Sequence, residues 1–125
     1  MRLLLDTHVL LWWLNSPSHL DPAAEAAISD GNNEIFVSAA TIWEVAIKRS
    51  IGRLTIPMPL TSTMTKAGLA ELPVRWDHAR RVARLPDHHR DPFDRVLVAQ
   101  AIEERLVIVT RDPLVRRYAV PTLAA

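Results

Sequence analysis

Short runs of consecutive apolar residues, separated by stretches with helical character, constrain the fold of this chain most strongly. Leu3 to Leu5 stand between Arg2 and Asp6, and Leu106 to Val109 are apolar without interruption. Such runs are typical of strands buried on both faces of a parallel sheet, because strands that face solvent on one side alternate apolar and polar residues. The chain is therefore predicted to contain a mostly parallel sheet covered by helices.

Helix-start and turn signals lie between these runs. Asp21-Pro22 and Asp91-Pro92 each combine a capping residue with a proline at the first helical position, and Thr7 is the predicted cap of the first helix. Strands alternating with helices in a short chain predict the α/β class. The expected strands are Leu3 to Leu5, Glu34 to Ser38, Leu72 to Val74 and Leu106 to Val109. The expected helices are one after Thr7 that stops at Asn15-Ser16-Pro17, Ala23 to Ser29, Ala39 to Ser50, one near Leu60 to Ala70, one capped by Asp77 that runs through Leu85, and one opened by Asp91-Pro92 that runs to about Arg105. Pro57, Pro59 and Pro73 are expected to break the middle of the chain.

Length, charge and cysteine content narrow the functional classes. A chain of 125 residues fits a single domain over residues 1–125. Its 15 Lys and Arg against 14 Asp and Glu give a net charge of +1, which favours no class of charged partner. With no cysteine, disulfide scaffolds, thiolate nucleophiles and cysteine-based zinc sites are excluded. The longest apolar run, Val9 to Leu14, is far shorter than the roughly 20 residues of a membrane helix, and no signal-peptide pattern is present, so a cytoplasmic protein is expected.

Four carboxylates stand next to apolar sequence: Asp6, Glu44, Asp94 and Asp112. Asp6 ends the first strand and Asp112 follows the last one, so both are expected at the carboxyl edge of the sheet, where open α/β sheets bind ligands. Glu44 and Asp94 lie near the starts of helices that leave or approach the same edge. The side chains of all four acids are therefore predicted to converge at this edge of the sheet.

Converging carboxylates must take up protons or share a cation, because they repel one another strongly in a crevice of low dielectric constant. An all-oxygen donor set matches Mg²⁺ or Mn²⁺. The chain has no cysteine and no His-x-x-His or His-Glu-x-x-His pattern, which are the usual signs of a zinc site. An ion of this kind can activate water and hold a phosphodiester for in-line attack.

Each acid also has a purely structural interpretation. Thr41 and Glu44 match a capping box, and Glu44 with Lys48 matches an ordinary i,i+4 ion pair. Asp91 is the predicted cap of its helix. The other three acids could serve helix starts or turns: Asp6, Asp94 and Asp112. The metal-site hypothesis therefore depends on the set rather than on any single member.

Histidine and tryptophan residues give weaker signals. His88 and His89 are predicted to lie in a solvated loop, and His8 near the expected site is interpreted as a polar contact. Trp12 and Trp13, with the apolar helices around them, offer more surface than a core of this size hides, which favours a symmetric dimer. The four tryptophans are interpreted as core or interface residues rather than base-stacking platforms: Trp12, Trp13, Trp43 and Trp76.

Four segments, LLLDTHVLLWWL at the start, VSAATIWEVAIK in the middle, and HRDPFDRVLVAQA and VTRD near the end, occur in this order. Together they resemble PIN-domain ribonucleases of the VapC toxin type, over essentially the whole chain. The resemblance implies a PIN-like α/β/α sandwich and Mg²⁺-dependent cleavage of RNA, with Mn²⁺ as a substitute ion. It also implies a homodimer and inhibition by a cognate VapB-like antitoxin.

The acidic residues of that family fall on the four positions already reached, Asp6, Glu44, Asp94 and Asp112, as catalytic and metal-binding residues. Asp6 and Asp94 are expected as principal ligands, and the other two would position or deprotonate the water. Thr110 matches a polar residue that lines the same pocket in the family, and Asp91 is left outside the metal set.

Two other functions remain open on the sequence. One is a non-catalytic PIN-like binding module. The other, a phosphotransfer domain, would need an Asp-x-Asp start, whereas Asp6 is followed by Thr7 and His8.

Overall fold

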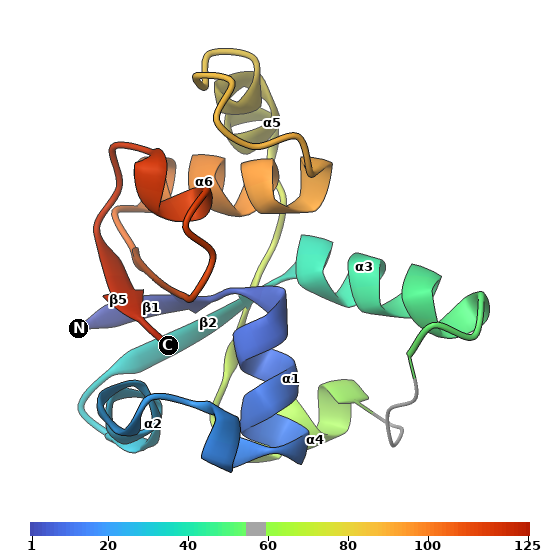
Figure 1. The fold of residues 1–125 in the computed structure, drawn as a ribbon, viewed down its shortest axis with the longest axis vertical. Helices are drawn as coiled ribbons and strands as arrows, with labels where there is room; N and C mark the ends of the chain where they lie inside the picture. The colour runs from blue at the N-terminus through green and yellow to red at the C-terminus, as the bar shows by residue number, and fades with distance from the viewer. Residues whose placement is uncertain (55–59) are drawn as a thin grey trace.

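The computed structural model describes residues 1–54 and 60–125 (Figure 1). In these residues five strands form an all-parallel sheet in the order β3-β2-β1-β4-β5, so the predicted α/β class is confirmed. The strands are Arg2–Leu5 (β1), Glu34–Ser38 (β2), Ala70–Leu72 (β3), Val107–Thr110 (β4) and Thr122–Ala124 (β5).

Helices cover both faces of the sheet, because each central strand buries its side chains alternately on opposite sides. Leu3 and Leu5 of β1 join one core cluster, whereas Leu4 joins the other. The first cluster takes residues from α1 (Thr7–Asn15), α2 (Pro22–Ser29), α3 (Ala39–Ser50) and α4 (Leu60–Lys66). The second takes residues from α6 (Pro92–Glu104), against which α5 (Trp76–Val82) packs (Figure 1).

Asp21 and Asp91 cap their helices as predicted, whereas Ser38 is a cap that was not predicted from the sequence. Asp21, Ser38 and Asp91 accept hydrogen bonds from the first turns of α2, α3 and α6. The first helix is different, because its cap is Asp6, whose Oδ1 accepts from the His8 N–H at 3.2 Å, and not Thr7. The Thr7 hydroxyl is directed to Glu44 instead.

Other predictions of local structure are wrong. The capping box of Thr41 and Glu44 does not exist, because α3 begins two residues before Thr41 and is capped by Ser38. Helix α5 begins at Trp76, ahead of the predicted cap Asp77, and ends at Val82 instead of Leu85.

The edges of the sheet also differ from the prediction. Helix α4 ends at Lys66, and β3 begins two residues before the predicted Leu72. Strand β4 extends to Thr110, and β5 was not predicted. The predicted breaks at Pro57 and Pro59 lie outside the described residues.

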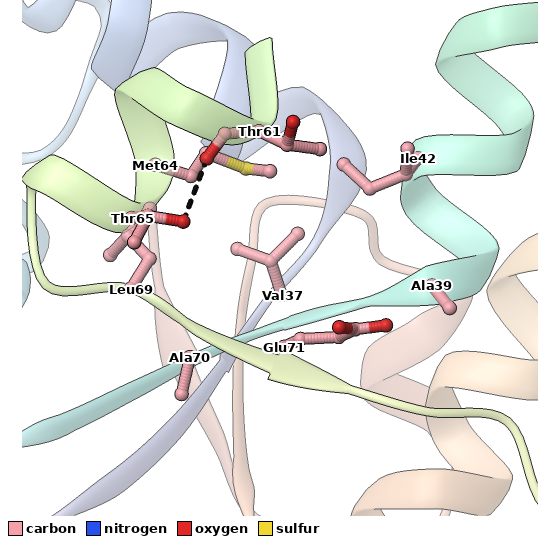
Figure 2. Close-up of a pocket in the computed structure, with 9 residues that line it drawn as sticks. All are labelled: Val37, Ala39, Ile42, Thr61, Met64, Thr65, Leu69, Ala70 and Glu71. Atoms are coloured by element: carbon pink, nitrogen blue, oxygen red, sulfur yellow. Dashed lines mark hydrogen bonds between the residues drawn. The ribbon is translucent and has the colours of Figure 1, made fainter.

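An apolar pocket of about 230 Å³ lies between α3, α4 and the edge strand β3 (Figure 2). Val37, Ile42 and Met64 line it, and Glu71 is the acidic residue in its lining. None of the four predicted site acids contributes to it, so this pocket lies apart from the candidate site. Within residues 1–54 and 60–125, no helix is long and apolar enough to cross a membrane.

Candidate metal centre

The carboxyl ends of β1 and β4 lie side by side and carry two of the predicted acids. Leu5 pairs with Val109, and the Asp6 N–H donates to the Val109 carbonyl at 3.0 Å. The Thr110 hydroxyl donates to Asp6 Oδ2 at 2.6 Å and accepts from the Asp112 N–H at 3.0 Å. One buried hydroxyl group therefore connects Asp6 to the loop that carries Asp112.

Glu44 enters the same region from α3, where its side chain is almost fully buried. Its Oε1 accepts a hydrogen bond at 2.8 Å from the hydroxyl group of Thr7, the residue that follows Asp6 in the chain. Its Oε2 pairs with Lys48 Nζ at 2.6 Å, so the predicted i,i+4 pair is confirmed. Both carboxylate oxygens of Glu44 thus have partners that fix its orientation.

Asp94 and Asp112 meet through a histidine. His89 Nε2 lies 3.1 Å from Asp94 Oδ2 and 2.8 Å from Asp112 Oδ2, and these three atoms all lie within 4.8 Å of one another. His89 is therefore part of the acidic site, and the prediction that it lies in a solvated loop is wrong. Only 12% of its side chain is exposed.

The backbone around Asp91 determines which ring nitrogen of His89 carries the proton. The Asp91 N–H donates to His89 Nδ1 at 3.1 Å, so Nδ1 is an acceptor and the proton is on Nε2. A histidine that binds a metal through Nε2 would instead donate a proton from Nδ1 to a neighbouring acceptor. In this arrangement His89 acts as a hydrogen-bond donor that holds two carboxylates together.

The acids are electrostatically coupled. The pKa of Asp94 is about 7, chiefly because the carboxyl group is buried and next because the charge of Asp6 is close. Burial also raises the pKa of Asp6, against the hydrogen bond from Thr110. Burial acts in the same direction on Asp112, but hydrogen bonds from the Leu114 N–H and from His89 outweigh it and lower the pKa.

All four predicted acids are thus brought to one edge of the sheet by four separate segments of the chain. Their oxygen atoms suit a hard divalent cation such as Mg²⁺ or Mn²⁺. The raised pKa values of Asp6 and Asp94 show that an uncompensated negative charge is unfavourable at this place. The donor set and its electrostatics therefore fit a bound cation.

A second group of possible ligands has a structural explanation. His78 on α5 is fully buried, with Nδ1 accepting from the Arg75 N–H at 3.0 Å and Nε2 lying 2.9 Å from Glu104 Oε1 on α6. The nearby Asp77 carboxylate pairs with the Arg75 guanidinium at 3.1 Å. The His78–Glu104 contact fixes α5 against α6, and the contacts of Arg75 stabilise the start of α5.

Comparison with known proteins places these features in context. A family model described as the PIN domain matches residues 3–121. Ribonuclease VapC22 of Mycobacterium tuberculosis (strain ATCC 25618 / H37Rv) is 32% identical over an alignment of 123 residues, and the match covers 94% of this chain and 92% of that protein.

Two solved structures share the fold. VapBC2 from Rickettsia felis, bound to a DNA fragment from its promoter, superposes with a TM-score of 0.71 at 16% identity, covering 99% of this chain and 98% of that one. DNA-bound VapBC from Salmonella typhimurium superposes with a TM-score of 0.70 at 16% identity and the same coverage. At this identity the likeness shows the fold alone, a five-stranded parallel sheet between layers of helices.

Proposed function

The chain belongs to the PIN-domain family, and from that premise we propose that it is a Mg²⁺-dependent endoribonuclease, the toxin of a toxin–antitoxin pair. The observation that carries the proposal is the meeting of four carboxylates at one buried edge of the sheet, linked by Thr7, Thr110 and His89. The 32% identity to a protein named as a ribonuclease supports the same activity.

Asp6 and Asp94 are the proposed principal ligands of the ion, with Mn²⁺ as a substitute for Mg²⁺. When bound, the ion supplies a Lewis acid that polarises the phosphodiester and activates water. Burial raises the pKa of both carboxyl groups, and repulsion by Asp112 on Asp6 and by Asp6 on Asp94 acts in the same direction, so an added positive charge at this position is favourable.

Glu44 and Asp112 are the proposed partners of the attacking water. The lowered pKa of Asp112 keeps it ionised at neutral pH, so its carboxylate can accept a hydrogen bond from water. Thr7 and Lys48 hold Glu44 in one orientation, and His89 holds Asp94 beside Asp112. These contacts position the acids before any substrate is bound.

The proposed partners are an RNA substrate in the cytoplasm and a VapB-like antitoxin. The solved structures that share the fold are toxin–antitoxin complexes, which supports the second partner. We propose that the antitoxin covers the acidic edge and presents an Arg or Lys to it, because a cation from the partner would neutralise the same carboxylates. We also treat residues 1–125 as one domain, since the sheet takes β1 and β5 from opposite ends of the chain.

A homodimer is part of the proposal, but its surface differs from the expected one. Trp12 and Trp13 are partly buried against the first core cluster, so they leave less apolar surface than the sequence suggests. Trp43 on α3 is 63% exposed and lies edge-on to Phe93, with ring centres 5.1 Å apart. These two rings and Val74 line an apolar groove of about 330 Å³, which is the proposed contact with a second copy.

The test of the activity is incubation of the purified protein with a mixed RNA pool, with and without Mg²⁺, followed by mapping of the new RNA ends. We expect cleavage that requires the ion and that is lost in Asp6→Asn and Asp94→Asn. Asp87→Asn is the matched control, because the Asp87 side chain is 99% exposed and outside the site. Binding of RNA without new ends would instead support the non-catalytic module.

A further inference from the structure

We propose that a second pocket beside the acidic edge is a subsite for one nucleobase of the RNA. The pocket has a volume of about 330 Å³, and its lining comprises Asp6, His8, Trp12, Arg111 and Asp112. The inference rests on the proposed function, because it assumes a single-stranded RNA substrate at the carboxylates.

The pocket's position matches that role. Two of its lining residues, Asp6 and Asp112, belong to the proposed metal centre, so a ligand in the pocket lies directly against the acids. A phosphodiester held at the carboxylates would therefore have a neighbouring base within reach of this pocket. Proteins that recognise single-stranded RNA stack its splayed bases on aromatic rings or on arginine planes.

Arg111 provides a plane that is already fixed in the folded protein. Its guanidinium carbon lies 4.4 Å from the centre of the Trp12 ring. Its Nη2 donates to the His19 carbonyl and, at 2.6 Å, to the main-chain oxygen of Ala125. Because these contacts immobilise the side chain, stacking a base on it has a small entropic cost.

His8 provides the second ring. Its side chain is exposed, and its ring centre lies 6.0 Å from that of Trp12 with a tilt of 41° between the planes. The His8 main-chain N–H, which caps α1 through Asp6, is independent of that side chain. The ring is thus available to contact a ligand and can be removed without disturbing the helix start.

The chemistry of the lining favours a base over the other parts of a nucleotide. The two carboxylates in the lining would accept a phosphate group only through a cation bound between them, so the rest of the lining is left to another part of the nucleotide. An indole, an imidazole and a guanidinium group all present flat π surfaces, which suit a flat neutral ring. The apolar groove at Trp43 has no charged side chain in its lining, so it lacks the guanidinium plane that Arg111 gives the pocket at the acidic edge.

The experiment is an NMR titration of the full chain in Mg²⁺ with AMP, GMP, CMP and UMP, and with ribose 5-phosphate as the ligand without a base. We expect the wild type to bind the nucleotides more tightly than ribose 5-phosphate. His8→Ala should weaken nucleotide binding by about five- to tenfold, in the lower part of the range for loss of a stacking contact, and leave ribose 5-phosphate unchanged. Trp76→Ala is the control, because Trp76 is 88% exposed and lies outside the pocket.

A second variant tests the guanidinium plane. Arg111→Lys keeps the charge but removes the flat surface, so it should weaken nucleotide binding as His8→Ala does. Equal nucleotide affinity in wild type and His8→Ala, or an equal loss for ribose 5-phosphate, would overturn the subsite. The titration measures binding and involves no cleavage, so it is independent of the RNA-pool assay. If the wild type binds nucleotides as described but cuts no RNA, the result supports the subsite and contradicts the proposed function.

Discussion

Thr110 shows how much one side chain contributes to the arrangement of the acids. Its buried hydroxyl group donates to Asp6 and accepts from the main chain of Asp112. The hydrogen bond to Asp6 lowers the pKa of that carboxyl group, against the effect of burial. Thr110 therefore acts on both the geometry and the charge of the site without being a proposed ligand.

Thr110→Val should lower the free energy of unfolding by about 1–3 kcal/mol, because it leaves a buried carboxyl oxygen and a backbone N–H without their partner. It should also weaken Mg²⁺ binding, since the pKa of Asp6 rises further. Urea unfolding and calorimetric titration with Mg²⁺ measure the two effects. Thr65→Val, which removes an exposed hydroxyl bonded to the Thr61 carbonyl, should change neither by a comparable amount. Unchanged Mg²⁺ affinity in Thr110→Val would contradict this role.

The raised pKa of Asp94 predicts an unusual pH dependence of stability in the metal-free protein. The unfolded chain loses this proton near pH 3.8, whereas the folded protein keeps it to about pH 7. Between these values the folded state binds more protons, so the free energy of unfolding falls as the pH rises, by a few kcal/mol at most.

Unfolding in EDTA at a series of pH values tests this expectation. In Asp94→Asn the decrease between about pH 4 and pH 7 should be much smaller than in the wild type, whereas Asp87→Asn should keep it. If wild type and Asp94→Asn have the same pH profile, Asp94 does not lie in the repulsive environment described above.

Sequence patterns indicate that the four acids converge, but of their side-chain partners they predict Lys48 and not His89. Asp6 and Asp112 could be predicted because the carboxyl ends of parallel strands meet at one edge. His89 could not, because its contacts to Asp94 and Asp112 depend on how two separate segments are packed. Its position two residues before the cap Asp91 is the local signal that could have suggested a role at this helix start.

Among the elements, α6 connects helix capping directly to the site. Asp91 Oδ1 accepts from the N–H groups of Phe93 at 2.8 Å and Asp94 at 3.2 Å. The same cap therefore begins the helix and fixes the backbone of a proposed metal ligand.

Asp91→Ala should lower the free energy of unfolding by about 0.5–2 kcal/mol and also reduce RNA cleavage, because the first turn of α6 loses its anchor. Asp21→Ala removes the equivalent cap of α2, a helix that carries none of the four acids, and should have a similar effect on stability alone. Denaturant unfolding and the RNA-pool assay on both variants separate the two effects. Equal cleavage by both variants would show that the cap has no influence on the site.

Elements that begin with a local signal are those that the sequence predicts well. The predicted caps Asp21 and Asp91 lie next to the helices that they start, so α2 and α6 were confirmed together with their caps. Helix α3 was also confirmed, but its cap Ser38 was not predicted. The start of α5 depends instead on His78, which is buried and pairs with Glu104 on α6. Strand β5 has three residues and is defined by pairing with β4, which no local pattern reveals.

At the scale of the whole molecule, two layers of helices enclose the sheet, and Trp43 and Val74 are among the large apolar side chains left exposed, in the groove that they line with Phe93. If this groove contacts a second copy, light scattering at tens of micromolar should show a dimer for the wild type and mostly monomer for Trp43→Ser. Trp76→Ser, which removes a more exposed ring outside the groove, should remain dimeric. A monomeric wild type would contradict the dimer, and a dimeric Trp43→Ser would contradict this surface.

The central claim, that Asp6 and Asp94 lie at a site for a divalent cation, is tested most directly by thermal unfolding with and without Mg²⁺. Without metal, Asp6→Asn and Asp94→Asn should melt above the wild type, because each removes a charge that its neighbours repel. Added Mg²⁺ should raise the melting temperature of the wild type and of Asp87→Asn by several degrees, and of the two site variants much less. The claim would be contradicted if Asp6→Asn and Asp94→Asn melt no higher than the wild type without metal and if Mg²⁺ raises their melting temperatures as much as that of the wild type.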